Sequence, residues 1–130
     1  MRQQKEDRRK RDEAEEALGK QLDEEQQVLD AVATRRRKTL MSAYVEAIRQ
    51  DVERSWRKPP SVKTGMSCVV GVIQIPGGEV VDANIVKCNT SDASFRTSVI
   101  NAVFKASPLP KPGDAVLFQR NIEFIFDARN

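Results

Sequence analysis

The stretch Met66-Ser-Cys-Val-Val-Gly-Val-Ile-Gln-Ile75, then Pro76-Gly77-Gly78, then Glu79-Val-Val-Asp-Ala-Asn-Ile-Val-Lys-Cys88 predicts a β-hairpin. Both arms are rich in β-branched residues, and the Pro-Gly-Gly sequence between them is typical of a turn. A loop over residues 77–79 sets the register of the two arms. In that register Ile75 meets Val81, Ile73 meets Ala83, and Cys68 meets Cys88.

The two cysteines therefore lie opposite each other on neighbouring strands. Directly opposed residues have Cβ atoms about 4.5–5.5 Å apart, close to the range of a disulfide. The sequence favours a Cys68–Cys88 bond over the alternative, two small reduced cysteines that happen to align. A disulfide implies an oxidising compartment outside the cytoplasm. Closing a loop of this length would stabilise the fold by about 3 kcal/mol.

The same register assigns the hairpin residues to two faces. One face is almost wholly apolar and is expected to meet the helices, with the disulfide on the other, more open face. The expected buried set is Val69, Ile73, Ile75, Val81, Ala83 and Ile85, and the expected open set is Cys68, Val70, Val72, Gln74, Asp82, Asn84, Val86 and Cys88.

Amphipathic patterns flank the hairpin. Before it, apolar residues recur every four positions until Pro59-Pro60 ends the helix, and they are Leu40, Tyr44, Ile48, Val52 and Trp56. After it, residues 90–107 predict a second helix capped by Ser91 or Asp92, with a buried stripe of Phe95, Val99, Ala102, Val103 and Ala106. A proline-rich connector follows, and residues 115–127 alternate as a half-buried strand does.

The order of elements predicts an α+β fold, with a three-stranded antiparallel sheet and helices packed on one face. Residues 39–130 form this domain, and residues 1–38 are a charged helical stalk. The stalk is expected to be helical toward its C-terminal end and frayed at its start, with a disordered charged tail as the alternative. Its Arg35-Arg36-Arg37-Lys38 run is read as a solvated helix end rather than a phosphate site.

Composition narrows the function. The 130 residues contain no His and two Cys, so the usual general base and a closed zinc site are both missing. We expect no catalytic residues, no metal and no cofactor, and therefore no enzyme. Neither a membrane-spanning run nor a secretory signal is visible, so we expect a fragment whose anchor or signal lies upstream.

Four ordered features resemble the C-terminal domains of the TolA/TonB type. They are the run from Tyr44 to Pro60, the hairpin with its Gly-Gly turn, the Cys88-to-Phe95 approach to a helix, and the Ser107-Pro-Leu-Pro110 connector before a last strand. The resemblance covers residues 40–126. A stalk without proline resembles TolA of Gram-negative bacteria more than TonB, whose linker is proline-rich.

The resemblance implies a periplasmic interaction domain of the Tol-Pal system, in a protein anchored in the inner membrane. Implied partners are TolB and Pal near the outer membrane and, through the anchor, TolQ and TolR. The system serves envelope integrity and cell division, and phage minor coat proteins and bacteriocin translocation domains exploit it for entry. The alternatives are a TonB-like energy transducer for outer-membrane transporters and a nucleic-acid-binding α+β module. We expect a monomer. We also expect no binding to nucleic acid, because the open face offers no aromatic residue for stacking on bases.

An open sheet has free edges that accept a strand from a partner. The last strand is long, alternating and free of proline, so we expect the partner there unless the stalk or the chain ends cover it. The expected edge comprises Val116, Leu117, Phe118, Gln119, Arg120, Asn121, Ile122, Glu123, Phe124, Ile125 and Phe126. Trp56 is expected in the core rather than as a partner anchor, because it continues the apolar helix face.

Overall fold

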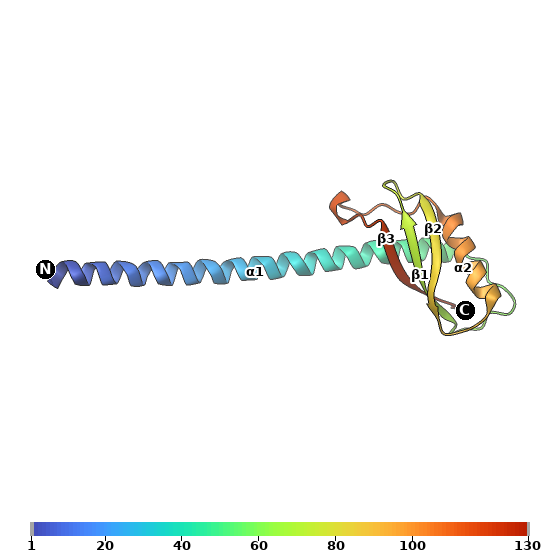
Figure 1. The fold of residues 1–130 in the computed structure, drawn as a ribbon, viewed down its shortest axis with the longest axis horizontal. Helices are drawn as coiled ribbons and strands as arrows, with labels where there is room; N and C mark the ends of the chain where they lie inside the picture. The colour runs from blue at the N-terminus through green and yellow to red at the C-terminus, as the bar shows by residue number, and fades with distance from the viewer. Residues whose placement is uncertain (1, 130) are drawn as a thin grey trace. The chain divides into compact units, whose positions relative to one another are not determined.

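The computed structural model describes residues 2–129 and has the α+β architecture that the sequence predicts (Figure 1). The elements in chain order are α1 (Arg2–Ser55), β1 (Ser67–Gln74), β2 (Val80–Cys88), α2 (Ala93–Ala106), the 3-10 helix η1 (Ala115–Leu117) and β3 (Asn121–Asp127). The strands form one antiparallel sheet in the order β2-β1-β3. The predicted three-stranded sheet is confirmed, with β2 and β3 at its edges.

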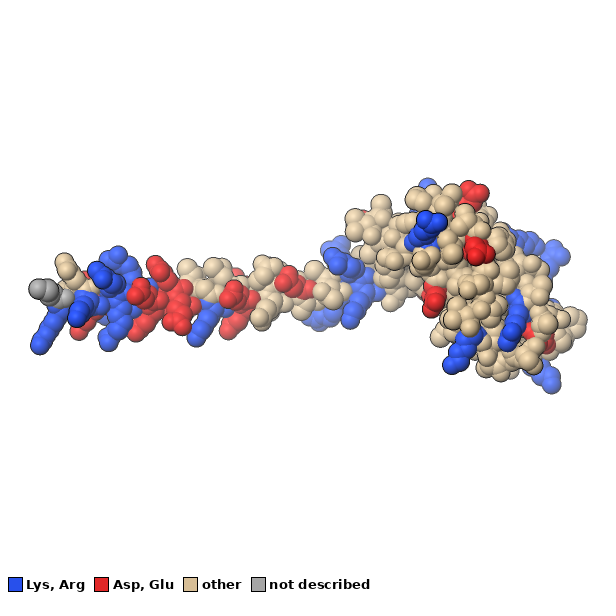
Figure 2. All heavy atoms as spheres, in the orientation of Figure 1, with Lys and Arg blue, Asp and Glu red and all other residues tan. Residues whose placement is uncertain are grey.

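Contacts within the chain form two compact units, Met1–Lys38 and Thr39–Asn130. The described part of the first unit is helical from Arg2 onward, without the frayed start that the sequence analysis expects. Lys, Arg, Asp and Glu side chains lie along it in bands of alternating sign (Figure 2), and Arg9 pairs with Glu13 at 3.9 Å. Such exposed pairs contribute little, so helix-forming residues dominate its local stability.

The core of the second unit lies on one side of the sheet. There the last turns of α1 contribute Tyr44, Ile48 and Val52. Helix α2 contributes the stripe predicted for it, Phe95, Val99, Ala102, Val103 and Ala106. Both helices therefore cover the same face, as predicted from their apolar spacing.

An aromatic cluster joins the two helices to the sheet. The Trp56 ring meets Phe126 of β3 edge-on at a centroid distance of 5.0 Å, and Phe95 of α2 at 6.0 Å. The indole Nε1 of Trp56 donates a hydrogen bond of 2.8 Å to the Ser98 hydroxyl. Trp56 is thus partly buried and packs against the core, as its place on the apolar helix face predicts.

The predicted hairpin faces are wrong for β1. Its buried side chains are Cys68, Val70, Val72 and Gln74, the set assigned to the open face, whereas Val69 and Ile73 are only half-buried. On β2 the assignment holds for Ala83 and Ile85, which pack against the core, but Val81 is 49% exposed.

Two register shifts in β2 explain this error. Cys68 still faces Cys88, as predicted, but Val70 meets Ile85 and Gln74 meets Val80. The shifts lie between Val69 and Val70 and between Ile73 and Gln74, and each inserts one extra β2 residue. A β-bulge exchanges the two faces of a strand beyond it, so a single uniform register cannot assign both arms.

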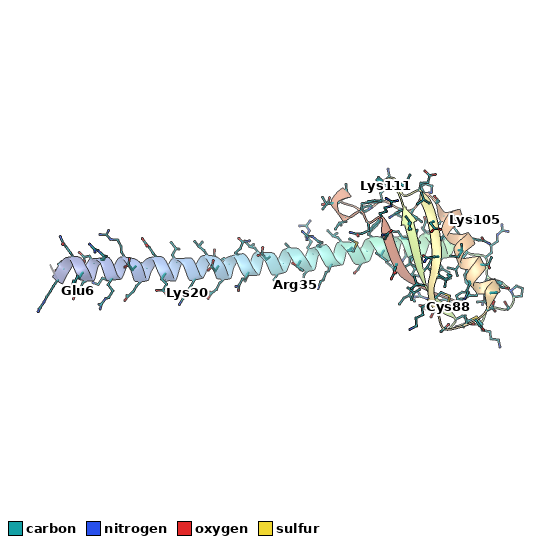
Figure 3. The ribbon with its side chains drawn as sticks, in the orientation of Figure 1. Glu6, Lys20, Arg35, Cys88, Lys105 and Lys111 are labelled. Carbon is teal, nitrogen blue, oxygen red and sulfur yellow. A yellow bond between two sulfur atoms is a disulfide. The ribbon has the colours of Figure 1, made fainter. Side chains whose placement is uncertain are left out.

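The Cys68–Cys88 disulfide is present, and it lies on the buried side of the sheet rather than the open one. Cys68 is 1% exposed and belongs to the core cluster, with Cys88 packed against it. Figure 3 shows Cys88 at the end of the sheet opposite Lys111. The bond therefore closes the core at the end of the hairpin that lies away from its turn.

The last segment differs from the predicted strand over 115–127. The strand β3 begins only at Asn121, and its buried residues are Ile122, Phe124 and Phe126, as the alternation predicts. Before it, the Asp114 carboxylate accepts a hydrogen bond from the Val116 N–H, which caps η1 instead of continuing a strand. Val116 consequently is 82% exposed, whereas Leu117 is buried.

We predict that the variant carrying both Cys68→Ala and Cys88→Ala loses about 3 kcal/mol of the free energy of unfolding, since the bridge closes a loop of 20 residues. Urea unfolding followed by Trp56 fluorescence measures this. The wild-type chain in reductant is the control and should lose a similar amount. Equal stabilities of the oxidised wild type and the variant would contradict the prediction.

We also predict an acid-sensitive contribution from the cap of α2. The hydrogen bond from the Phe95 N–H lowers the pKa of Asp92 below its ordinary value of 3.8. A lowered pKa in the folded chain gives stability that is complete above the unfolded pKa and lost as pH falls through the folded one. The Asp92→Asn variant keeps a capping acceptor that does not titrate. Its stability relative to wild type should rise between about pH 6 and about pH 2 in urea unfolding, and a pH-independent difference would refute the assignment.

Candidate functional site

The outer edge of β3 is an unpaired row of backbone groups. At one end of the β1–β3 pair, Gln74 N–H donates to the Arg120 carbonyl at 2.9 Å, and at the other Ala128 N–H donates to the Met66 carbonyl at 2.8 Å. Antiparallel strands direct the backbone groups of alternate residues to the same neighbour. The even-numbered residues Ile122, Phe124 and Phe126 therefore bond to β1.

The odd-numbered residues of β3 consequently direct their N–H and C=O groups outward. These residues are Asn121, Glu123, Ile125 and Asp127. Their side chains lie on the open face of the sheet, and Ile125 is 57% exposed. No strand in residues 2–129 pairs with this side of β3. The edge thus offers hydrogen bonds to an extended segment over the length of β3.

The structure divides the edge expected from the sequence into three parts. Val116 and Leu117 belong to η1, and Phe118 to Arg120 form a loop. Only residues 121–126 of the expected set lie in the strand. Two charged residues, Glu123 and Asp127, occupy outward-directed positions of β3. The Arg120 carbonyl is already bonded to Gln74.

The opposite edge, on β2, is partly engaged. At its start the Ser107 hydroxyl accepts a hydrogen bond of 3.0 Å from the Val80 N–H. The Asp82 carboxylate accepts another, of 2.9 Å, from the Ala83 N–H. Helix α2 also packs beside β2. The two edges are therefore unequal, and β3 is the better acceptor of a strand.

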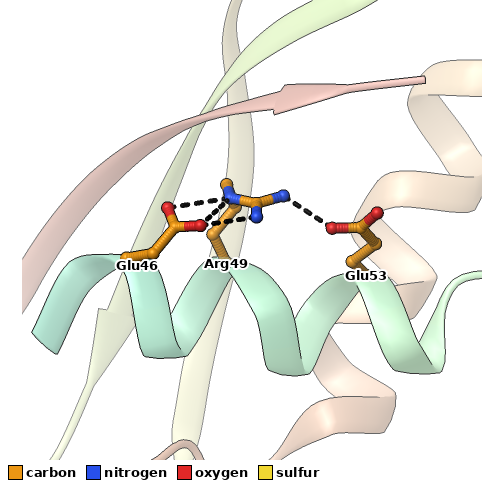
Figure 4. A network of polar contacts seen from close by, with 3 residues as sticks. All are labelled: Glu46, Arg49 and Glu53. Carbon is orange, nitrogen blue, oxygen red and sulfur yellow. Dashed lines mark hydrogen bonds and ion pairs between the residues drawn. The ribbon is translucent and has the colours of Figure 1, made fainter. Parts of the chain in front are cut away.

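Helix α1 presents a charged cluster on the side where β3 crosses it (Figure 4). The guanidinium of Arg49 lies between two carboxylates, with Nη2 2.6 Å from the Glu46 Oε1 and Nη1 2.6 Å from the Glu53 Oε2. The Arg49 side chain is 11% exposed, whereas those of Glu46 and Glu53 are 50% and 36% exposed. We call these three residues the Arg49 cluster.

The Arg49 cluster combines one guanidinium with two carboxylates, and the contact between Arg49 and Glu46 favours the charged form of both groups. Hydrogen bonding to Arg49 lowers the pKa of Glu46, with a further contribution from the charge of Arg129 beyond β3. The two carboxylates in turn raise the pKa of Arg49 above its already high ordinary value. The guanidinium is therefore held in place, and its two partners remain accessible to a charged group that approaches the edge.

An apolar pocket of about 300 Å³ lies in the second unit, next to the residues that precede β3 in the chain. Its lining combines the Tyr44 ring with prolines and the Phe118 ring, and comprises Tyr44, Pro76, Gly77, Gly78, Pro110, Lys111, Pro112, Ala115 and Phe118. The Leu109 N–H donates to the Gly78 carbonyl at 2.7 Å, which holds the proline-rich connector against the hairpin turn. Gly78 has φ +90°, and a side chain there would overlap the Leu109 backbone.

Gln74 fixes one wall of this pocket. Its side-chain Nε2 donates to the Tyr44 hydroxyl at 2.7 Å and to the Gln119 carbonyl at 2.9 Å. The side chain is fully buried, and its Oε1 has no hydrogen-bond partner among the described residues. The amide thus joins α1, β1 and the loop before β3 at one point.

Sequence reasoning found the edge but missed the cluster and the pocket. The spacing of Glu46, Arg49 and Glu53, three and four residues apart, is a signal for ion pairs on a helix. No comparable signal exists for the pocket, since its lining comes from four separate segments. Among residues 2–129, no group of three or more His, Cys, Asp or Glu is placed to hold a metal ion. None of the described helices has the length and apolar character needed to cross a bilayer.

Comparisons with known sequences identify relatives of this chain. A family model described as TonB C terminal matches residues 41–126. The Tol-Pal system protein TolA of Pseudomonas aeruginosa (strain PAO1) is 32% identical over 60 residues. That match covers 46% of this chain and 17% of the relative, so the chain spans only a small part of that protein.

Two solved structures are similar. One is a solution NMR structure of TolAIII bound to a peptide derived from the N-terminus of TolB, with a TM-score of 0.60 and 25% identity over 68% of this chain and 74% of that chain. The other is the NMR structure of the Helicobacter pylori TonB C-terminal domain, with a TM-score of 0.50 and 20% identity over 66% of this chain and 92% of that chain. At that identity the second likeness concerns the fold alone.

We predict that Arg49→Met lowers the free energy of unfolding by up to about 1 kcal/mol for each of the two ion pairs that it removes. Met retains much of the packing made by the aliphatic part of the Arg49 side chain. The loss of stability therefore reports chiefly on the ion pairs. Arg54→Met is the matched control, because Arg54 pairs with Asp51 at 2.8 Å but its side chain is 67% exposed. Urea unfolding should show a larger loss for Arg49→Met, and equal losses would contradict the role given to burial.

Proposed function

The chain belongs to the TonB C-terminal family, whose model matches residues 41–126 of its 130, and from that premise we propose that it is an interaction domain of a Tol-Pal system. Its β3 edge receives an extended segment of TolB as an additional strand. The observation that carries this proposal is the free outer edge of β3, with four residues whose backbone groups point outward. The similarity to a TolAIII domain bound to a TolB-derived peptide supports the choice of partner.

The remaining features fit a periplasmic domain of a protein anchored in the inner membrane. The Cys68–Cys88 disulfide requires an oxidising compartment, and the periplasm is one. In this proposal residues 1–38 are the end of a helical stalk that spans the periplasm. The proposed role is mechanical and recognitional rather than enzymatic, and Pal is a further proposed partner. TolQ and TolR would act through an anchoring segment, and functions in cell division and in phage or bacteriocin entry follow from the same assignment.

A TonB-like transducer is the competing proposal, because the H. pylori TonB domain shares the fold. The stalk argues against it, since residues 2–55 form one helix and contain no proline. A nucleic-acid-binding role has less support. The described open face of the sheet carries Val69, Gly71, Ile73, Asn84, Val86, Glu123 and Ile125, and no aromatic side chain among them would stack on a base.

We predict that Glu123→Pro weakens binding of an N-terminal TolB peptide at least about tenfold, because it removes an outward N–H donor at the centre of the β3 edge. The substitution spares the bonds to β1, which come from the even-numbered residues. Binding is measured by amide chemical shifts of the labelled chain, with the largest changes expected at Asn121, Glu123 and Ile125. Glu123→Ala, which keeps the donor, is the matched control and should bind nearly as the wild type does.

Unchanged affinity of a folded Glu123→Pro variant would exclude the β3 edge. The Trp56 indole resonance reports folding, because that group is bonded to Ser98 in the core. A peptide from the periplasmic end of an outer-membrane transporter discriminates the competing proposal. Tighter binding of that peptide than of the TolB peptide would favour the TonB-like function.

A further inference from the structure

We propose that the apolar pocket beyond the start of β3 is an anchoring subsite, which takes one apolar side chain of the segment that pairs with β3. This inference rests on the proposed function and specifies it further. It assigns the pocket, rather than the strand edge alone, as a source of sequence selectivity. Backbone pairing is nearly independent of sequence, so a strand edge needs side-chain pockets to distinguish one partner from another.

The location of the pocket connects it to the edge. Ile73 pairs with Asn121 at the start of β3, and the β1 chain then continues through Gln74 into the turn that contributes Pro76 and Gly77 to the pocket. Phe118, three residues before β3, forms another part of the lining. A segment that bonds to Asn121 and continues past the start of β3 therefore reaches the pocket within a few residues, at about 3.3 Å each.

The lining defines the chemistry of the occupant. Tyr44, Phe118 and three prolines offer ring and methylene surfaces, and the volume of about 300 Å³ is at the lower end of the range for ligand pockets. It fits a side chain such as Leu, Ile or Phe rather than a folded element. Lys111 supplies a positive charge to the lining, and no acidic residue among the described ones does. An acidic residue next to the apolar anchor is therefore favoured by charge complementarity.

The pocket is built before a partner arrives. The Gln74 amide holds the Tyr44 hydroxyl at 2.7 Å, and the Gly78 carbonyl holds the Leu109 N–H at 2.7 Å, so two of its walls are tied by hydrogen bonds. Lys111 lies at the same end of the sheet as the hairpin turn (Figure 3). A preformed pocket loses less conformational freedom on binding than a mobile loop does, which favours its use as an anchor.

A double-mutant cycle between pocket and peptide tests the inference. The probe is the N-terminal TolB peptide and its single alanine variants, titrated by calorimetry against the full chain. Ala115→Phe fills the pocket from its lining, and Val116→Phe places the same side chain on the adjacent residue, which is 82% exposed and outside the lining. We expect one apolar peptide position whose truncation weakens binding about tenfold on the wild type and on Val116→Phe. The same truncation should have no effect on Ala115→Phe.

The outcomes separate a failure of the anchoring subsite from a failure of the strand-addition function. Peptide binding that Glu123→Pro abolishes but Ala115→Phe leaves unchanged would overturn the anchoring subsite and leave the strand-addition function standing. No binding of the peptide to the wild-type chain would overturn both. Should Ala115→Phe not fold, Phe118→Ala replaces it, and the peptide position that couples to Phe118 must then be the same apolar one.

Discussion

The central strand β1 constrains the rest of the second unit. It is the one strand of the described sheet with neighbours on both sides, and its side chains alternate strictly between a buried and an open face. Neither its register nor its faces can shift without breaking both ladders. The other elements adjust to it: β2 accommodates two bulges, β3 begins only where it can bond to β1, and the helices cover the face that presents Val70 and Val72.

This constraint also separates what the sequence predicts from what it does not. Helix stripes such as Phe95, Val99 and Val103 were predictable, because burial in a helix follows a local period. The cysteine pairing was predictable from loop length. The hairpin faces were not, because a bulge leaves no mark in the alternation of residues, and Gln74 looks like a surface residue until its partners Tyr44 and Gln119 are known. Likewise, the Asp114 cap overrides an alternating pattern that favoured a longer strand.

The candidate site also has features that the sequence predicts and features that it does not. The free edge of β3 was predictable from strand order, since an outer strand of an open sheet has one unpaired side. The sequence did not predict which residues of β3 direct their backbone groups outward, because this depends on the register with β1. The Arg49 cluster and the apolar pocket give this edge two chemically different surroundings, one charged and one apolar. An added strand would meet both, and its side chains, not its backbone, would determine which partner fits.

The disulfide has a consequence for a chain that is pulled. A covalent ring encloses the hairpin from Cys68 to Cys88, two cysteines that are 20 positions apart in the sequence. Under tension those residues cannot straighten, so a fully extended chain is shorter by about 70 Å than its residue count implies, at about 3.3–3.6 Å per residue. The load passes through the sulfur–sulfur bond and bypasses the turn. A tether built this way has a limited reach, and two of its three strands stay looped together even after every hydrogen bond has broken.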